Sequence, residues 1–179
     1  MKTKDLAAIA MMTTLLVVLS YIPGIPLGFI PVPIVLQNLG VMLAGCLLGG
    51  KKGSLSVCLL FLVGLAIPAF SGFTTTIQVL IGPTAGYVWT WLLVPLLLDW
   101  GLSHLRKITA LTSFIVIWLT GVFFVDLLGG LYLAVYTGMS IFTAVVSSSL
   151  AFIPGDSLKV LVATLVFLRF HKISASHKS

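Results

Sequence analysis

The sequence contains no glutamate, and its 179 residues include only four acidic residues, all of them aspartate. Charged residues make up 8% of the chain, whereas about 25% is usual in a soluble domain. The missing glutamate excludes a glutamate general base or metal ligand, and the three histidines show no metal-ligand spacing. So few charges cannot cover a soluble surface, and with 59% apolar residues the chain is predicted to be a membrane protein.

Cysteine is also scarce. Cys46 and Cys58 stand alone within apolar runs, which favours buried thiols over a disulfide framework. The net charge of +6 does not indicate a nucleic-acid partner, because the basic residues form small clusters between hydrophobic stretches instead of one exposed face interleaved with aromatic side chains. Such clusters are typical of the loops of membrane proteins.

A membrane-spanning helix needs about 20 mainly apolar residues. The sequence supplies six such windows, and they run from Leu6 to Ile22, Ile34 to Leu48, Ser54 to Phe70, Pro83 to Trp100, Ile108 to Leu128 and Ile141 to Phe170. The fold class predicted is an all-α membrane protein, a compact bundle of six transmembrane helices in which residues 1–179 form a single integral membrane domain. The first window lacks a small-x-small cleavage site, so we expect it to remain as a helix.

The positions of lysine and arginine predict the orientation. Nine of the ten basic residues fall on one side of a six-helix arrangement, namely Lys2, Lys4, Lys51, Lys52, Arg106, Lys107, Arg169, Lys172 and Lys178. The connections expected on the other side carry no charge, and they run from Ser20 to Pro33, Ser71 to Gly82 and Gly129 to Ser140. By the positive-inside rule, both termini are expected in the cytoplasm.

Residues 45–51 match the G-x4-G-K spacing of a phosphate-binding loop. The next residue is Lys52 instead of the serine or threonine that holds magnesium, and no strand precedes the glycines. We therefore interpret Gly45 and Gly49, like Gly82 and Gly86, as small residues that let helix backbones approach closely.

Asp156 and Lys159 are the residues that most need an explanation, because a charge inside a membrane helix costs about 2.5–3.5 kcal/mol. Their spacing places both side chains on nearly the same helix face. Counting from Arg169 at 1.5 Å per residue puts Lys159 about 15 Å into the bilayer, in its outer half. Pro154 and Gly155 predict a break in the helix beside the pair, with open carbonyls and a polar indentation.

Two interpretations of this pair stay open from the residues alone. One is an internal ion pair, although a buried pair is often no more stabilising than apolar residues of the same volume. The other, which we favour, is a binding site in which Lys159 meets a ligand carboxylate and Asp156 accepts hydrogen bonds from N–H groups.

Further polar side chains near outer helix ends are candidates for the same pocket: Gln37, Asn38, Gln78, Thr84 and Tyr87. For Gln37, Thr84 and Tyr87, helix capping or helix–helix bonding is an equal alternative.

Other conspicuous residues have less specific interpretations. Asp99, near Arg106 and Lys107, is expected to be a helix-boundary or salt-bridge residue. Asp126 is as well explained by solvation or helix–helix bonding as by ligand contact. The four tryptophans, Trp89, Trp91, Trp100 and Trp118, are expected to face lipid or the interface.

At these positions the sequence resembles the BioY family, the substrate-binding (S) components of energy-coupling-factor (ECF) biotin transporters. The resemblance covers nearly the whole chain and rests on residues 30–37 (IPVPIVLQ), 43–49 (LAGCLLG), 82–87 (GPTAGY) and Pro154-Gly155-Asp156 with Lys159. The family usually has threonine where this chain has Val35.

The resemblance implies that the protein captures biotin from the extracellular side with high affinity and works at the plasma membrane. It further implies docking on a transmembrane T component with two ATPase subunits, so that the chain itself is no enzyme. No catalytic residue, metal or cofactor is then expected, and biotin is the transported ligand.

For biotin, the valerate carboxylate is expected to pair with Lys159 and a ureido N–H with Asp156. The ureido oxygen needs a donor such as Gln37 or Tyr87, and Thr84 is a further candidate contact.

The family also implies small residues spaced four apart in the first helix as the surface that docks on the partner. Ala7 and Ala8 fit this surface, but Met11 and Met12 follow them at the next positions.

Other functions remain open: an S component for another water-soluble vitamin, or, in a different class, a small channel or a structural membrane subunit. An intramembrane enzyme is poorly supported, because no nucleophile–base pair or metal cluster is expected at membrane depth.

Overall fold

The computed structural model describes residues 2–176, with side chains through residue 173. Its elements are all helices: α1 (Thr3–Ser20), α2 (Gln37–Leu48), α3 (Gly50–Ala66), α4 (Thr76–Ile81), α5 (Ala85–Thr90), α6 (Val94–Ser103), α7 (Ala110–Trp118), the π-helix η1 (Leu119–Phe123), α8 (Phe124–Thr137) and α9 (Ile141–Ser176). Within the described residues, extended pairing is limited to the bridges Ile25–Ile34 and Phe70–Thr74. The predicted all-α class is therefore confirmed.

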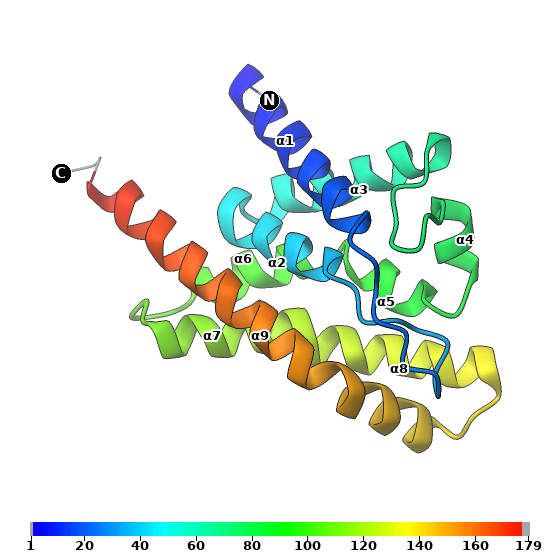
Figure 1. Cartoon of the computed structure of the whole chain (residues 1–179). Coiled ribbons are helices and arrows are strands. Elements are labelled where there is room, and N and C mark those ends of the chain that lie inside the picture. The colour runs from blue at the N-terminus through cyan, green and yellow to red at the C-terminus, as the bar shows by residue number, and fades with distance from the viewer. Residues whose placement is uncertain (1, 177–179) are drawn as a thin grey trace.

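The helices pack as two groups that meet at the centre of the molecule. Helices α7, η1 and α8 form one continuous helix that packs along α9 (Figure 1). Helices α2 and α3 pack on each other and on both α1 and α6, and α2 also contacts α9. Helix α5 packs on α8, which places it beside the central junction.

Three helical segments are long and apolar enough to cross a membrane: Thr3–Ser20, Ala110–Thr137 and Ile141–Ile173. The other predicted windows correspond to shorter elements. Helices α2 and α3 have 12 and 17 residues, and the fourth window is divided into α5 and α6 by a turn at residues 91–93. The helix count is thus higher than the window count, and six spans remain a prediction.

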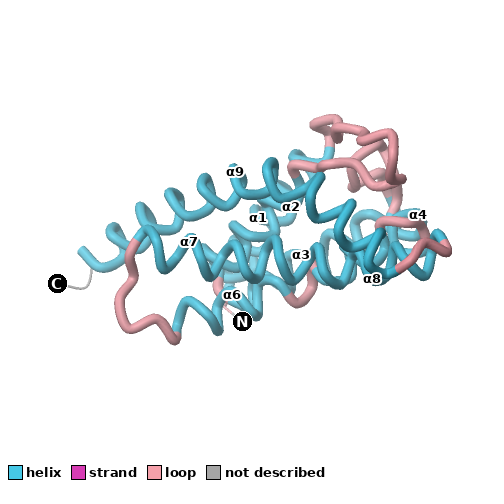
Figure 2. Tube along the Cα trace, turned by 90° about the horizontal axis from the view of Figure 1, so that it is seen from below, coloured by secondary structure: helices cyan, strands magenta, loops and turns pink. Residues whose placement is uncertain are grey.

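The basic connections lie toward one side of the molecule. The start of α1, the end of α9 and the α6–α7 connection lie on that side, while residues 21–36 and the α8–α9 connection lie opposite (Figure 1). Figure 2 shows the longer loops gathered at opposite ends of the helices. On the basic side, Lys52 pairs with Asp5 and links α3 to α1. Lys178 lies outside the described residues.

Two predictions about the backbone were wrong, and Cys58 on α3 is exposed instead of buried. The chain from 129 to 137 is helical instead of a loop, because Gly129 and Gly130 allow α8 to pack tightly against Tyr87 and α9. Helix α9 also runs without a break through Pro154 and Gly155. A proline removes only one backbone hydrogen bond, and the remaining bonds of this long helix hold it continuous on both sides of Pro154.

Helix α9 has an apolar outer face and a mixed inner face. Leu158, Leu161 and Leu165 are exposed, whereas Asp156 and Lys159 are 6% and 8% exposed. This inversion of the soluble pattern is expected for a helix that faces hydrocarbon outward and the bundle inward.

Glycine permits the closest helix contacts. A Cβ atom on Gly53 would lie 2.7 Å from Pro95 Cβ and 2.9 Å from the Ala44 backbone, so α3 meets both α2 and α6 there. Gly45 and Gly86 approach α6 and α8 in the same way, as their spacing predicted. Gly49 serves differently, because its φ of 77° forms the turn between α2 and α3.

We predict that Gly53→Ala destabilises the fold by about 1–3 kcal/mol through overpacking, because backbone atoms cannot yield to the new methyl group. Gly155→Ala is the matched control. Gly155 also lies within a helix, but its Cβ would meet only the Ile34 side chain, at 3.6 Å. Melting temperatures in detergent will compare the two. Equal melting of both variants would contradict the packing described for Gly53.

Candidate functional site

A cavity of about 300 Å³ lies where α2, α5, α8, α9 and the 31–35 segment converge. Its apolar wall consists of Pro31, Val32, Pro33, Ile34, Val35, Phe70, Val79, Pro83, Val88, Trp91, Val125 and Phe152. Its polar residues are Gln37, Asn38, Ser71, Thr74, Gln78, Thr84, Tyr87, Asp126, Asp156 and Lys159. An apolar wall with a few convergent polar groups is the usual composition of a small-molecule site.

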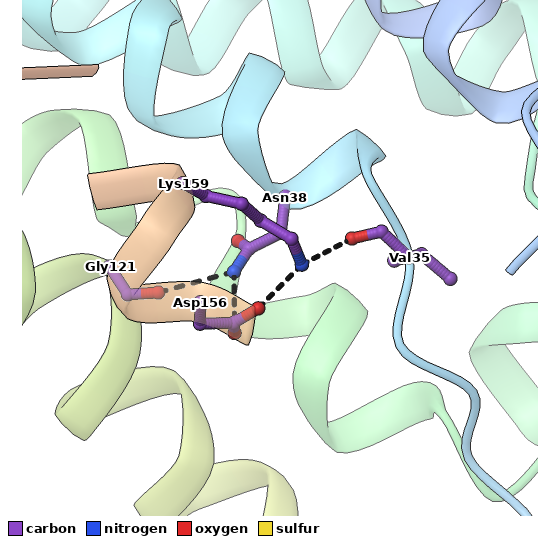
Figure 3. A network of polar contacts seen from close by, with 5 residues as sticks. All are labelled: Val35, Asn38, Gly121, Asp156 and Lys159. Atoms are coloured by element: carbon purple, nitrogen blue, oxygen red, sulfur yellow. Dashed lines mark hydrogen bonds and ion pairs between the residues drawn. The ribbon is translucent and has the colours of Figure 1, made fainter. Parts of the chain in front are cut away.

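The structure brings Asp156 and Lys159 together at this cavity. Lys159 Nζ lies 2.5 Å from Asp156 Oδ1 and donates a second hydrogen bond, of 2.6 Å, to the Val35 carbonyl (Figure 3). The two side chains are 9% and 8% exposed. An ammonium group has three donors, so Lys159 retains one N–H for a further acceptor.

Asn38 connects the ion pair to two other helices. Its Nδ2 donates 3.3 Å hydrogen bonds to Asp156 Oδ2 and to the Gly121 carbonyl in η1 (Figure 3). A π-turn departs from regular α-helical hydrogen bonding and is frequent at functional sites. The network therefore joins α2, η1, α9 and the 31–35 segment around the two charges.

All five predicted binding residues line the cavity, and Gln37, Thr84 and Tyr87, like the ion pair, also contact other parts of the protein. Gln37 Nε2 donates to the Ala69 carbonyl at 2.9 Å, and Thr84 Oγ1 donates to the Val79 carbonyl at 3.3 Å. The Tyr87 ring fits against Gly129, where a Cβ would collide with it, and meets Phe152 edge-on at 5.6 Å. Structural contacts and cavity lining thus coexist at these positions.

Several polar atoms in the cavity wall lack partners. Gln37 Oε1, Asn38 Oδ1 and Asp126 Oδ2 are buried and accept no hydrogen bond from the described residues. Gln37 Nε2 donates one hydrogen bond and Asn38 Nδ2 donates two, so the free oxygens of both amides are acceptors. Ser71 Oγ and Tyr87 Oη in the same wall are also without partners among the described residues, and a hydroxyl can donate as well as accept. Buried polar groups are normally satisfied, so these acceptors indicate a ligand or water that brings donors.

Sequence reasoning misplaced one residue and left another undecided. Trp91 was expected to face lipid but is 4% exposed, lines the cavity and stacks near Phe70 at a centroid distance of 6.4 Å. The turn between α5 and α6 directs it inward. Asp126 is 3% exposed and lines the cavity, and only its position inside an apolar run could have signalled it.

The predicted docking residues lie on α1, away from the cavity lining. Ala7 is exposed and Ala8 half-buried, and Met11 is 73% exposed next to them along the helix. Their docking role remains a prediction.

These features define a class of protein: an all-helical protein with membrane-length helices and an internal, charge-containing site for a small molecule. The sequence profile of the BioY family matches residues 1–176. The chain belongs to the BioY family.

Individual relatives agree with the family assignment. The chain is 39% identical over 175 residues to the biotin transporter BioY of Lactococcus lactis subsp. cremoris, covering 96% of this chain and 92% of that protein. It is 37% identical to the biotin transporter BioY of Rhizobium etli, covering 93% and 92%. The crystal structure of the S-component for biotin from an ECF-type ABC transporter matches with a TM-score of 0.89 and 37% identity, covering 96% and 95%.

We predict that removing one member of the ion pair destabilises the protein more than removing both. Lys159→Met leaves a buried carboxylate and should cost on the order of 3 kcal/mol, whereas Asp156→Leu combined with Lys159→Met should melt higher than either single variant. Thermal unfolding without ligand measures this, with the exposed Lys107→Met as control. Additive losses would contradict a direct pair.

Proposed function

We propose that this protein is the biotin-binding S component of an ECF-type transporter. The observation that carries the proposal is the cavity, in which a buried ion pair with a spare donor adjoins unpartnered acceptors. Relatives at 37–39% identity are named biotin transporters, and the matching crystal structure is an S-component for biotin. Another vitamin, a channel or a structural subunit gains no support from these relatives.

Biotin suits the chemistry of the cavity. Its carboxylate accepts from Lys159, whose remaining donor is directed by the Asp156 and Val35 contacts. Its rings bury against the apolar wall, where Trp91 and Phe70 offer aromatic surface. For the ureido oxygen, both Tyr87 and Gln37 offer a donor, since the Gln37 amide nitrogen has a second N–H besides the one bonded to the Ala69 carbonyl.

The ion pair is too compact for both ends of biotin. Lys159 Nζ and Asp156 Oδ1 are 2.5 Å apart, whereas a butyl chain and a fused ring separate the carboxylate of biotin from its ureido group. One end of the ligand therefore meets the pair. Asp156 then serves chiefly to hold Lys159 in place, beside any hydrogen bond that it accepts itself.

In the proposed arrangement the chain is one integral membrane domain with six spans and cytoplasmic termini in the plasma membrane. The separation of basic and uncharged connections supports this orientation. Ala7 and Ala8 contribute to docking on a transmembrane T component, and two ATPase subunits supply the energy of uptake. The chain itself binds and releases biotin without chemical change.

We predict that the purified wild-type chain binds biotin in detergent without ATP or partner subunits. Lys159→Ala should weaken biotin binding by about tenfold or more, because a charged hydrogen bond is worth about 1.5–3 kcal/mol. Biotinamide lacks the carboxylate charge, so the same substitution should weaken the binding of biotinamide only slightly. Isothermal titration measures both ligands.

Lys107→Ala is the matched control, an exposed lysine outside the cavity, and should bind as the wild type does. Thiamine and riboflavin serve as control ligands that should not raise the melting temperature. Absence of biotin binding by the wild type would refute the proposed function. If Lys159→Ala weakened the binding of biotin and of biotinamide equally, the biotin carboxylate would not be the group that binds Lys159.

We predict opposite accessibilities for two connections. In a variant whose native cysteines are replaced by alanine, Phe29→Cys should react with a membrane-impermeant maleimide in intact cells, and Lys107→Cys only after permeabilisation. Both positions are exposed, so access depends on the side of the membrane. The reverse pattern would contradict cytoplasmic termini.

A further inference from the structure

Asp126 is a second buried carboxyl group in the cavity wall. It lies on the inner face of α8 with Val125, Gly129 and Leu133, and its side chain is 3% exposed. Its Oδ2 atom is buried without a hydrogen-bond partner among the described residues. A buried carboxyl oxygen without a donor is costly, so the fold alone gives no reason for an aspartate here.

The two aspartates of the cavity differ in what they already bind. Both oxygens of Asp156 are engaged, Oδ1 by Lys159 and Oδ2 by Asn38. Asp126 lies close enough to both members of the pair for electrostatic interaction, yet no lysine or arginine closes an ion pair with it in the described residues. Asp126 therefore has the larger free capacity for a ligand, because its buried Oδ2 accepts no hydrogen bond from the described residues.

The ion pair is too compact to bind both ends of the ligand. If the ligand carboxylate meets Lys159, the polar ring at the other end of the ligand needs an acceptor that is separate from the pair. Asp126 supplies a carboxyl oxygen, and the unpartnered Gln37 Oε1 is a further acceptor in the same wall. Ring N–H groups are the donors that such oxygens lack.

We infer that Asp126 determines specificity by accepting a hydrogen bond from a ring N–H of the ligand, which in biotin is a ureido N–H. The inference rests on the proposed function and moves this contact from Asp156 to Asp126. It assigns Asp156 to positioning Lys159, and Asp126 to recognition of the cyclic urea.

The test combines binding with stability. Asp126→Leu should weaken biotin binding by about tenfold or more, while the ligand-free variant melts at or above the wild-type temperature, because no internal hydrogen bond is lost. Asp126→Asn retains an acceptor oxygen and should lose less biotin affinity than Asp126→Leu does. Asp99→Asn, an exposed aspartate outside the cavity, should bind as the wild type does.

A ligand-side comparison identifies the donor. Wild-type protein should prefer biotin over biotin N-methylated at the contacted ureido nitrogen, and Asp126→Leu should lose most of that preference, since the two changes remove the same hydrogen bond. Both mono-N-methylated isomers are titrated. Unchanged biotin affinity in Asp126→Leu, an undiminished preference, or a lowered ligand-free melting temperature would each overturn the inference. Wild-type protein that binds no biotin would overturn the proposed function together with this inference.

Discussion

The buried contact between Lys159 and Asp156 is the interaction on which the rest of the site depends. Two charges in an apolar interior persist only when they are paired and hydrogen-bonded, and here Val35 and Asn38 complete the partners. Through these bonds α9 is tied to the 31–35 segment and to α2. The pair therefore positions a charge and also holds the cavity wall together.

The helical environment explains why the polar groups converge. In hydrocarbon, polar side chains gain nothing by facing outward, so α8 and α9 direct Asp126, Asp156 and Lys159 inward, while leucines of α9 such as Leu158 and Leu161 face outward. Small residues then bring the helices close enough to enclose the space. Gly129 illustrates this, because its missing side chain leaves room for the Tyr87 ring at the cavity.

Sequence patterns predicted the features that depend on local spacing and composition. The apolar windows located most helices, and the three-residue interval placed Asp156 and Lys159 on one face. Features that depend on tertiary context were not predictable. Trp91 turns inward because of a break between α5 and α6, and α9 continues through Pro154 because its remaining hydrogen bonds hold it. The π-turn that presents the Gly121 carbonyl to Asn38 has no sequence signature.

The central claim is that the cavity beside the ion pair holds the ligand. A crystal structure of the protein with biotin tests this most directly. The account predicts biotin inside the cavity, with its carboxylate within hydrogen-bonding distance of Lys159 Nζ and its rings against Trp91 and Phe70. Biotin bound elsewhere, with the cavity empty and Lys159 bonded only to Asp156 and Val35, would contradict it.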